Sequence, residues 1–86
     1  MRLDKFLKLS RIIKRRTLAK EVADQGRVTI NGNQAKAASR VAIGDELAIR
    51  FGQKLVTLEV LDLKENVKKA EAESMYRIIQ EEKITE

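Results

Sequence analysis

The chain has 86 residues, a formal net charge of +5 and 43% hydrophobic residues. This length allows one small domain with a thin stability margin and little room for a deep catalytic cleft. The chain contains no cysteine and no histidine, which excludes a disulfide framework, a zinc site of the usual kind, a cysteine nucleophile and a histidine general base. We therefore expect a protein that is not an enzyme and that uses no metal and no cofactor.

The sequence predicts neither export nor insertion into a membrane. The N-terminus is charged and is not followed by an apolar run, so no signal peptide is expected. No segment approaches the roughly 20 apolar residues that span a bilayer. A basic amphipathic N-terminal helix could lie on anionic lipid, but so small a domain needs the apolar face of that helix for its core. We expect a cytoplasmic location and no membrane partner.

The positive charge is concentrated in the first half of the chain. Residues 1–50 carry 12 Lys or Arg against 5 Asp or Glu, giving +7, whereas residues 51–86 carry 6 against 8, giving −2. Eight basic residues and one acid, Asp4, lie between Arg2 and Lys20. This asymmetry indicates a polyanionic partner.

Apolar spacing predicts two short helices at the N-terminus. Leu3 and Phe6 begin an i, i+3, i+4 pattern that favours a helix over Leu3–Leu9. Thr17 is the expected N-cap of a second helix, and Gly26 sits where a left-handed residue would end it. The basic link between the two helices makes a compact corner.

Strands are predicted through the middle of the chain. Arg27–Ile30 alternates and is followed by Asn31-Gly32, a strong signal for a type I′ hairpin turn, with a return strand over residues 33–36. Two further strands are predicted over Glu46–Phe51 and Leu55–Leu61. The register of the last strand stays open because apolar residues occur on both of its faces.

The last segment has helical spacing. Ala70, Ser74 and Ile78 fall near one face, which predicts a helix over Val67–Lys83 with Asn66 as its cap. The element order is then α-α-β-β-β-β-α. The fold class is α+β, with two N-terminal helices packed on a small, mostly antiparallel sheet and a C-terminal helix. No proline or low-complexity linker divides the chain, so we expect a single domain over 1–86.

Clustered Lys and Arg are typical of proteins that bind nucleic-acid backbones. Aromatic residues make up only 3% of the chain, which favours shape recognition of a folded RNA over stacking on single-stranded bases. A DNA-binding helix-turn-helix regulator is an alternative, although its recognition helix would carry Glu21 and Asp24. A small protein-interaction regulator is another alternative, if the apolar face between Ala70 and Ile79 is poorly buried.

Several short motifs resemble the S4 RNA-binding domain in their order and spacing. They are Arg2-Leu3-Asp4-Lys5, Arg15-Arg16, Leu18-Ala19, Gly26-Arg27-Val28, Val28-Thr29-Ile30-Asn31-Gly32, Lys36 with Ser39, and Val41-Ala42-Ile43-Gly44-Asp45. The resemblance covers about residues 1–51 and implies that structured RNA binds to the helix corner and the following hairpin. The implied RNA-binding residues are Arg2, Lys5, Arg11, Lys14, Arg15, Arg16, Lys20, Lys36, Ser39 and Arg40. For Arg2, an ion pair with Asp4 is the structural alternative.

A stand-alone S4 domain of this length is similar to the short family members of ribosome-associated quality control, and more distantly to the ribosome-associated heat-shock proteins of fifteen kilodaltons. This resemblance implies 23S rRNA, the large ribosomal subunit, peptidyl-tRNA and a nascent-chain tailing factor as partners, and support for alanine tailing. The heat-shock proteins carry a longer basic tail, whereas this chain is acidic from Glu71 onward. The expected division is an RNA-binding core over 1–51, a supporting strand over 52–65 and a C-terminal helix over 66–86.

Overall fold

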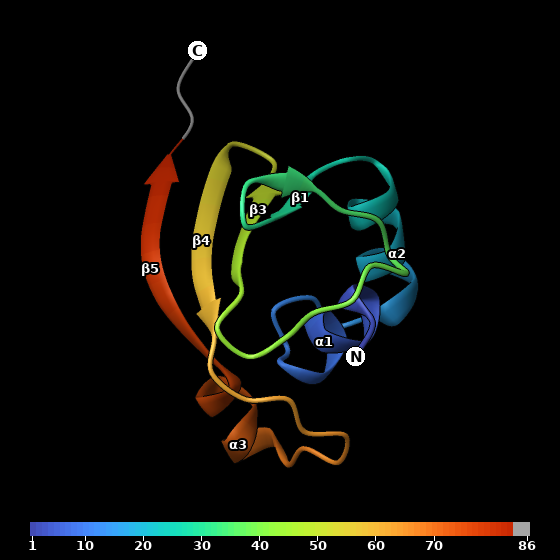
Figure 1. Cartoon of the computed structure of the whole chain (residues 1–86), viewed down its shortest axis with the longest axis vertical. Helices are drawn as coiled ribbons and strands as arrows, with labels where there is room; N and C mark the ends of the chain where they lie inside the picture. The colour runs from blue at the N-terminus through green and yellow to red at the C-terminus, as the bar shows by residue number, and fades with distance from the viewer. Residues whose placement is uncertain (84–86) are drawn as a thin grey trace.

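The computed structural model describes residues 1–83, in which two helices pack against a five-stranded sheet (Figure 1). The sheet has the order β2-β1-β3-β4-β5, and every neighbouring pair is antiparallel, so the α+β class is confirmed. Each helix within residues 1–83 is too short or too polar to cross a bilayer. The elements are α1 (Leu3–Leu9), α2 (Arg16–Asp24), β1 (Val28–Ile30), β2 (Asn33–Gln34), β3 (Glu46–Phe51), β4 (Lys54–Val60), α3 (Lys69–Ala72), the 3-10 helix η1 (Glu73–Met75) and β5 (Tyr76–Lys83).

The core forms between the two N-terminal helices and the inner face of the sheet. Leu3, Phe6 and Leu7 of α1 have no exposed surface, as their helical spacing predicts. Burying each such side chain contributes about 1.5–3 kcal/mol. The link between the helices adds Ile13, which is 4% exposed, and leaves the neighbouring basic side chains outside. The core therefore fixes the corner from which the basic residues project.

Strands β3 and β4 show the alternation that the sequence predicts. Leu47 and Ile49 are fully buried on β3, and they pair with Leu58 and Val56 of β4. The open register of β4 is settled by this pairing, because Val56, Leu58 and Val60 all face the helices while the residues between them lie on the other side.

The predicted hairpin turn is present, because Asn31 and Gly32 have φ angles of 51° and 85°, as a type I′ turn requires. The return strand is shorter than expected: β2 ends at Gln34, since the chain then turns toward α2. The Thr17 cap is wrong. Helix α2 begins one residue earlier, at Arg16, after the extended residue Arg15, and no side chain caps it.

The predicted helix over Val67–Lys83 is also wrong. Only Lys69–Ala72 is α-helical, Asn66 does not cap it, and Tyr76–Lys83 forms β5 at the edge of the sheet (Figure 1). Pairing with β4 explains the difference, because a strand here covers an edge that a helix would leave with unpaired backbone groups. The expected division of residues 66–86 is corrected accordingly, and residues 84–86 lie outside the described residues.

Candidate nucleic-acid interface

The segment that follows β2 runs beside the N-terminus of α1 (Figure 1). The backbone N–H of Leu3 donates to the carbonyl of Ser39 at 2.8 Å, and Arg2 and Arg40 form an isolated antiparallel bridge. Residues directly opposite one another in such a bridge have Cβ atoms about 4.5–5.5 Å apart. The side chains of Arg2 and Arg40 therefore leave the backbone next to each other.

Asp4 is the buried acid around which the arginines gather, and it is 2% exposed. Arg2 donates from Nε to Oδ1 and from Nη2 to Oδ2 of Asp4, both at 3.2 Å. Arg16 Nε lies 3.5 Å from Asp4 Oδ2, and the backbone N–H of Lys5 donates to Oδ1 at 2.8 Å. The side chains of Arg2 and Arg16 nevertheless remain 45% and 50% exposed. The acid thus fixes the two guanidinium groups without hiding them.

We call Arg2, Arg16 and Arg40 the arginine cluster. The guanidinium groups of Arg2 and Arg16 contact one carboxylate, which leaves a local charge of +1, and Arg40, whose backbone is bridged to that of Arg2, adds a further positive charge nearby. Neighbouring guanidinium groups repel one another. The negative charge of Asp4 offsets only part of this repulsion. Each guanidinium carries five N–H donors in a planar fork, more than Asp4 engages. This arrangement can bind an anion with forked acceptors, such as a phosphate.

Lys36 and Ser39 shape the loop that presents Arg40. Ser39 Oγ accepts from the backbone N–H of Lys36 at 2.9 Å. Lys36 Nζ donates to the carbonyl of Asp24 at 3.3 Å, at the negative end of α2, and the Asp24 carboxylate accepts from the backbone N–H of Ala37 at 3.0 Å. These bonds tie the loop to α2. Lys20 lies on the exposed face of the same helix.

Within residues 1–83, the charged groups of the other basic residues predicted to bind RNA form no ion pair with Asp4. Lys5 Nζ is 3.2 Å from Glu65 Oε1, so an acid of the C-terminal half partly neutralises its charge. Arg15 is exposed at the start of α2. Arg11 and Lys14 border a hollow at the C-terminal end of α1. Asp4 contacts both Arg2 and Arg16, and the backbone bridge to Arg2 places Arg40 beside them. Direct contacts therefore gather only part of the predicted set of RNA-binding residues.

Two residues of this surface are missing from the predicted set. The sequence analysis pairs Asp4 with Arg2 alone, whereas the structure gives Asp4 a second arginine partner, Arg16. Lys8 lines the same hollow as Arg11 and Lys14. The three-residue spacing of Arg2, Lys5 and Lys8, which is close to one helical turn, is a signal that could have found Lys8.

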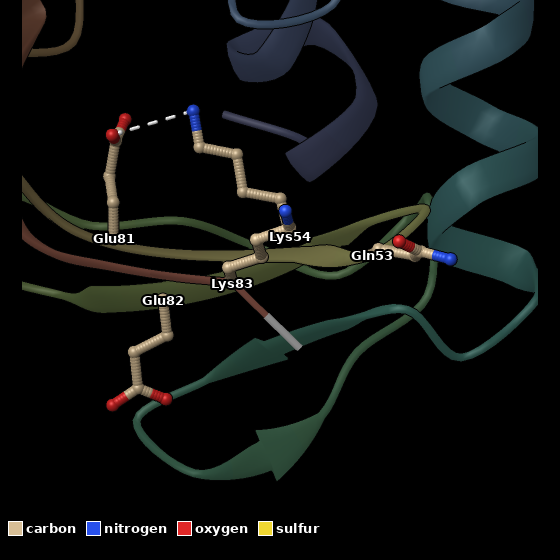
Figure 2. A pocket seen from close by; sticks show the side chains of 5 residues that line it. All are labelled: Gln53, Lys54, Glu81, Glu82 and Lys83. Carbon is tan, nitrogen blue, oxygen red and sulfur yellow. Dashed lines mark ion pairs between the residues drawn. The ribbon is translucent and has the colours of Figure 1, made fainter. Parts of the chain in front are cut away.

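A different hollow lies at the far end of β4 and β5, where its charges largely cancel. Figure 2 shows the side chains of Lys54 and Glu81 pointing toward one another, with a separation of 3.4 Å between Nζ and Oε2. Gln53, Glu82 and Lys83 complete its lining. Among residues 1–83, no group of three or more acidic side chains is placed to hold a metal ion. The arginine cluster is therefore the better candidate interface.

Comparisons with known proteins agree with this fold. Residues 1–47 match the family model of the S4 domain. The chain is 71% identical over 86 residues to the RQC P-site tRNA stabilizing factor of Bacillus subtilis (strain 168), with 100% of both chains covered. It is 65% identical over 85 residues to the protein of the same name from Halalkalibacterium halodurans, with 99% of this chain and 97% of the relative covered.

A solved structure gives the same result. The trimeric structure of Vibrio cholerae heat shock protein 15 matches with a TM-score of 0.83 and 34% identity, over 91% of this chain and 80% of that one. The chain therefore belongs to the S4 domain family of RNA-binding proteins, in the group that contains the RQC P-site tRNA stabilizing factors and heat shock protein 15.

Proposed function

We propose that the chain is a non-enzymatic factor that binds 23S rRNA and peptidyl-tRNA on stalled large ribosomal subunits in the cytoplasm. In this role it supports ribosome-associated quality control, including alanine tailing of the nascent chain by a partner factor. The name of its relatives, RQC P-site tRNA stabilizing factor, supports the tRNA part of the proposal. The observation that carries it is the pair Arg2 and Arg16, held half-exposed by one buried acid, Asp4.

The mechanism is electrostatic docking. Arginines that neutralise phosphates release condensed counterions, and this release provides much of the binding free energy. Asp4 holds Arg2 and Arg16 in place before RNA arrives, so less side-chain freedom is lost on binding. A small, rigid cationic corner can thus hold a tRNA against an rRNA helix while the tailing factor acts.

A second candidate is a protein-interaction surface on β5. Ile78 and Ile79 are 42% and 44% exposed, whereas Ala72 and Met75 are buried, so the poorly buried apolar face that this alternative requires is present only in part. The DNA-binding alternative is weaker, because Glu21 and Asp24 lie exposed on α2 and would face the phosphates. RNA binding is the main proposed activity, and the β5 surface is the second candidate.

Sedimentation with purified large subunits tests this proposal. Subunits that carry peptidyl-tRNA should bind the chain more tightly than empty subunits, and binding to both should weaken steeply between 50 and 200 mM salt, on the order of 10³-fold for about six phosphate contacts. Binding that survives high salt would favour the protein-interaction role. Preference for duplex DNA over rRNA in a competition assay would favour the DNA-binding role.

A further inference from the structure

We propose that Asp24, an acid at the C-terminal end of α2, is a positioning residue for RNA binding. Its carboxylate holds the loop over residues 35–41, and this loop brings Arg40 to the arginine cluster. The choice of RNA as the ligand rests on the proposed function, whereas the contact between Asp24 and the loop is a feature of the fold. The proposal has an unusual consequence, because it makes an acid strengthen the binding of a polyanion.

Two hydrogen bonds of Ala37 connect Asp24 to Asp4. The backbone N–H of Ala37 donates to Asp24 Oδ1 at 3.0 Å, and its carbonyl accepts from the backbone N–H of Asp4 at 3.2 Å. Ala37 is 2% exposed, so both bonds are shielded from water. Asp4 in turn contacts Arg2 and Arg16. One alanine thus joins the end of α2 to the acid that holds both arginines.

The same loop closes the N-terminal end of α1. No side chain caps this helix, and the backbone N–H of Leu3 donates instead to the carbonyl of Ser39 at 2.8 Å. On the other side of Arg40, the backbone N–H of Val41 donates to the carbonyl of Met1 at 2.8 Å. If the loop moved away from α2, the first amides of α1 would lose these partners, and Arg40 would leave the arginine cluster.

Electrostatics alone gives no reason for an acid at this position. The last turn of α2 contains no basic residue, and the negative end of the helix dipole repels a carboxylate there. Asp24 also lowers the positive charge of the N-terminal half, which weakens the attraction of a polyanion. Lys36 Nζ, which donates to the carbonyl of Asp24 at 3.3 Å, offsets part of this penalty. The hydrogen bond to Ala37 accounts for the acid, because it requires an acceptor at the end of the helix.

Three variants of equal net charge separate positioning from charge. Asp24→Ala, Asp24→Asn and Glu21→Ala each raise the formal net charge of the chain from +5 to +6. An asparagine oxygen can still accept from the single N–H of Ala37, whereas alanine has no acceptor. Glu21→Ala is the matched control, because Glu21 is an exposed acid three residues earlier in α2. Within residues 1–83, its side chain forms no hydrogen bond and no ion pair.

Titration with protein-free 23S rRNA measures the effect on binding. Asp24→Ala should bind about threefold to tenfold more weakly than wild type, which is the loss expected from one hydrogen bond. Asp24→Asn and Glu21→Ala should bind at least as tightly as wild type, because both remove a negative charge and keep the loop in place. Arg40→Ala should weaken binding less in the Asp24→Ala background than in wild type, because the arginine is no longer held at the cluster there.

Hydrogen exchange of the free protein tests the link between the two acids without RNA. Asp24→Ala should accelerate the exchange of the Ala37 and Asp4 amides about tenfold more than that of the amides paired between β3 and β4. A role in overall stability predicts a different pattern, in which the loop and the sheet accelerate equally. Asp24→Asn should exchange like wild type at both loop-linked amides.

The possible outcomes separate the claims. Binding by Asp24→Ala that is as tight as binding by Glu21→Ala would overturn the positioning role. Equal losses for Asp24→Ala and Asp24→Asn, or equal acceleration of exchange in the loop and the sheet, would overturn it as well. If Arg16→Ala weakens rRNA binding while Asp24→Ala does not, only the positioning role fails. If the wild-type chain does not bind rRNA, the proposed function fails and the positioning role fails with it.

Discussion

Replacing Arg16 with alanine should weaken binding to large subunits that carry peptidyl-tRNA by about tenfold to a hundredfold. Hydrogen bonds that involve a charged group contribute about 1.5–3 kcal/mol, and every 1.4 kcal/mol is a factor of ten in affinity. The fold should persist, because the Arg16 side chain is half exposed and Asp4 keeps both hydrogen bonds to Arg2. Sedimentation at several salt concentrations measures the affinity, and the salt slope should fall by about one unit.

Two further variants sharpen this result. Arg16→Lys keeps the charge and loses the planar fork, so its affinity should lie between those of wild type and Arg16→Ala. Arg2→Ala should behave like Arg16→Ala, because the two side chains share the same acid. Wild-type sedimentation of both alanine variants, with folding verified by circular dichroism, would contradict the assignment of these arginines.

Replacing Asp4 with asparagine should weaken RNA binding about tenfold, although it raises the formal net charge of the chain from +5 to +6. A role for charge alone predicts the opposite sign, because a more positive protein should bind a polyanion more tightly. We expect the loss because the amide cannot accept from the two arginines as a carboxylate does, so their guanidinium groups repel each other and lose their fixed positions. The free energy of unfolding should fall by about 2 kcal/mol.

Urea denaturation and rRNA titration of the same variant measure the two effects. A double-mutant cycle then tests their origin: Arg16→Ala should cost less affinity in the Asp4→Asn background than in wild type, because the arginine is no longer positioned there. Tighter RNA binding by Asp4→Asn would show that Asp4 merely reduces the charge of this surface.

The N-terminal half of the fold was predictable because its signals are local. The helical spacing of Leu3 and Phe6 depends on which residues lie within one turn, and Asn31-Gly32 specifies its turn by backbone preference alone. The extended residue Arg15, which precedes α2, has no such local signal. Helix α2 starts at Arg16, the residue that contacts Asp4, and these two residues are twelve positions apart in the sequence.

The strand β5 was missed because its alternation is interrupted. Ile78 pairs with Leu58 and Gln80 pairs with Thr57, so Ile79 is an extra residue in a bulge. Because of the bulge, the next inward-facing position after Ile78 is Glu81, three residues later instead of two. This interval breaks the two-residue period that marks a strand. Together with the helical turn before it, the segment imitates a longer helix. Only the pairing with β4 distinguishes the two, and that pairing is not local.

The candidate site was predictable in residue type and not in arrangement. Concentrated Lys and Arg indicate an anionic partner from the sequence alone. The juxtaposition of Arg2 and Arg40 requires the loop after β2 to return to the N-terminus, across nearly forty residues. The sequence therefore gives no means of separating the arginine cluster from the cations at the other end of α1.

Site-directed photocrosslinking on stalled large subunits tests most directly whether the helix corner is the RNA-binding surface. A photoreactive side chain at Thr17, exposed next to Arg16, should crosslink to 23S rRNA or to peptidyl-tRNA. The same group at Gln53, exposed at the turn between β3 and β4, should give no crosslink to either RNA (Figure 2). RNA crosslinks from Gln53 together with none from Thr17 would contradict the RNA-binding role of the arginine cluster.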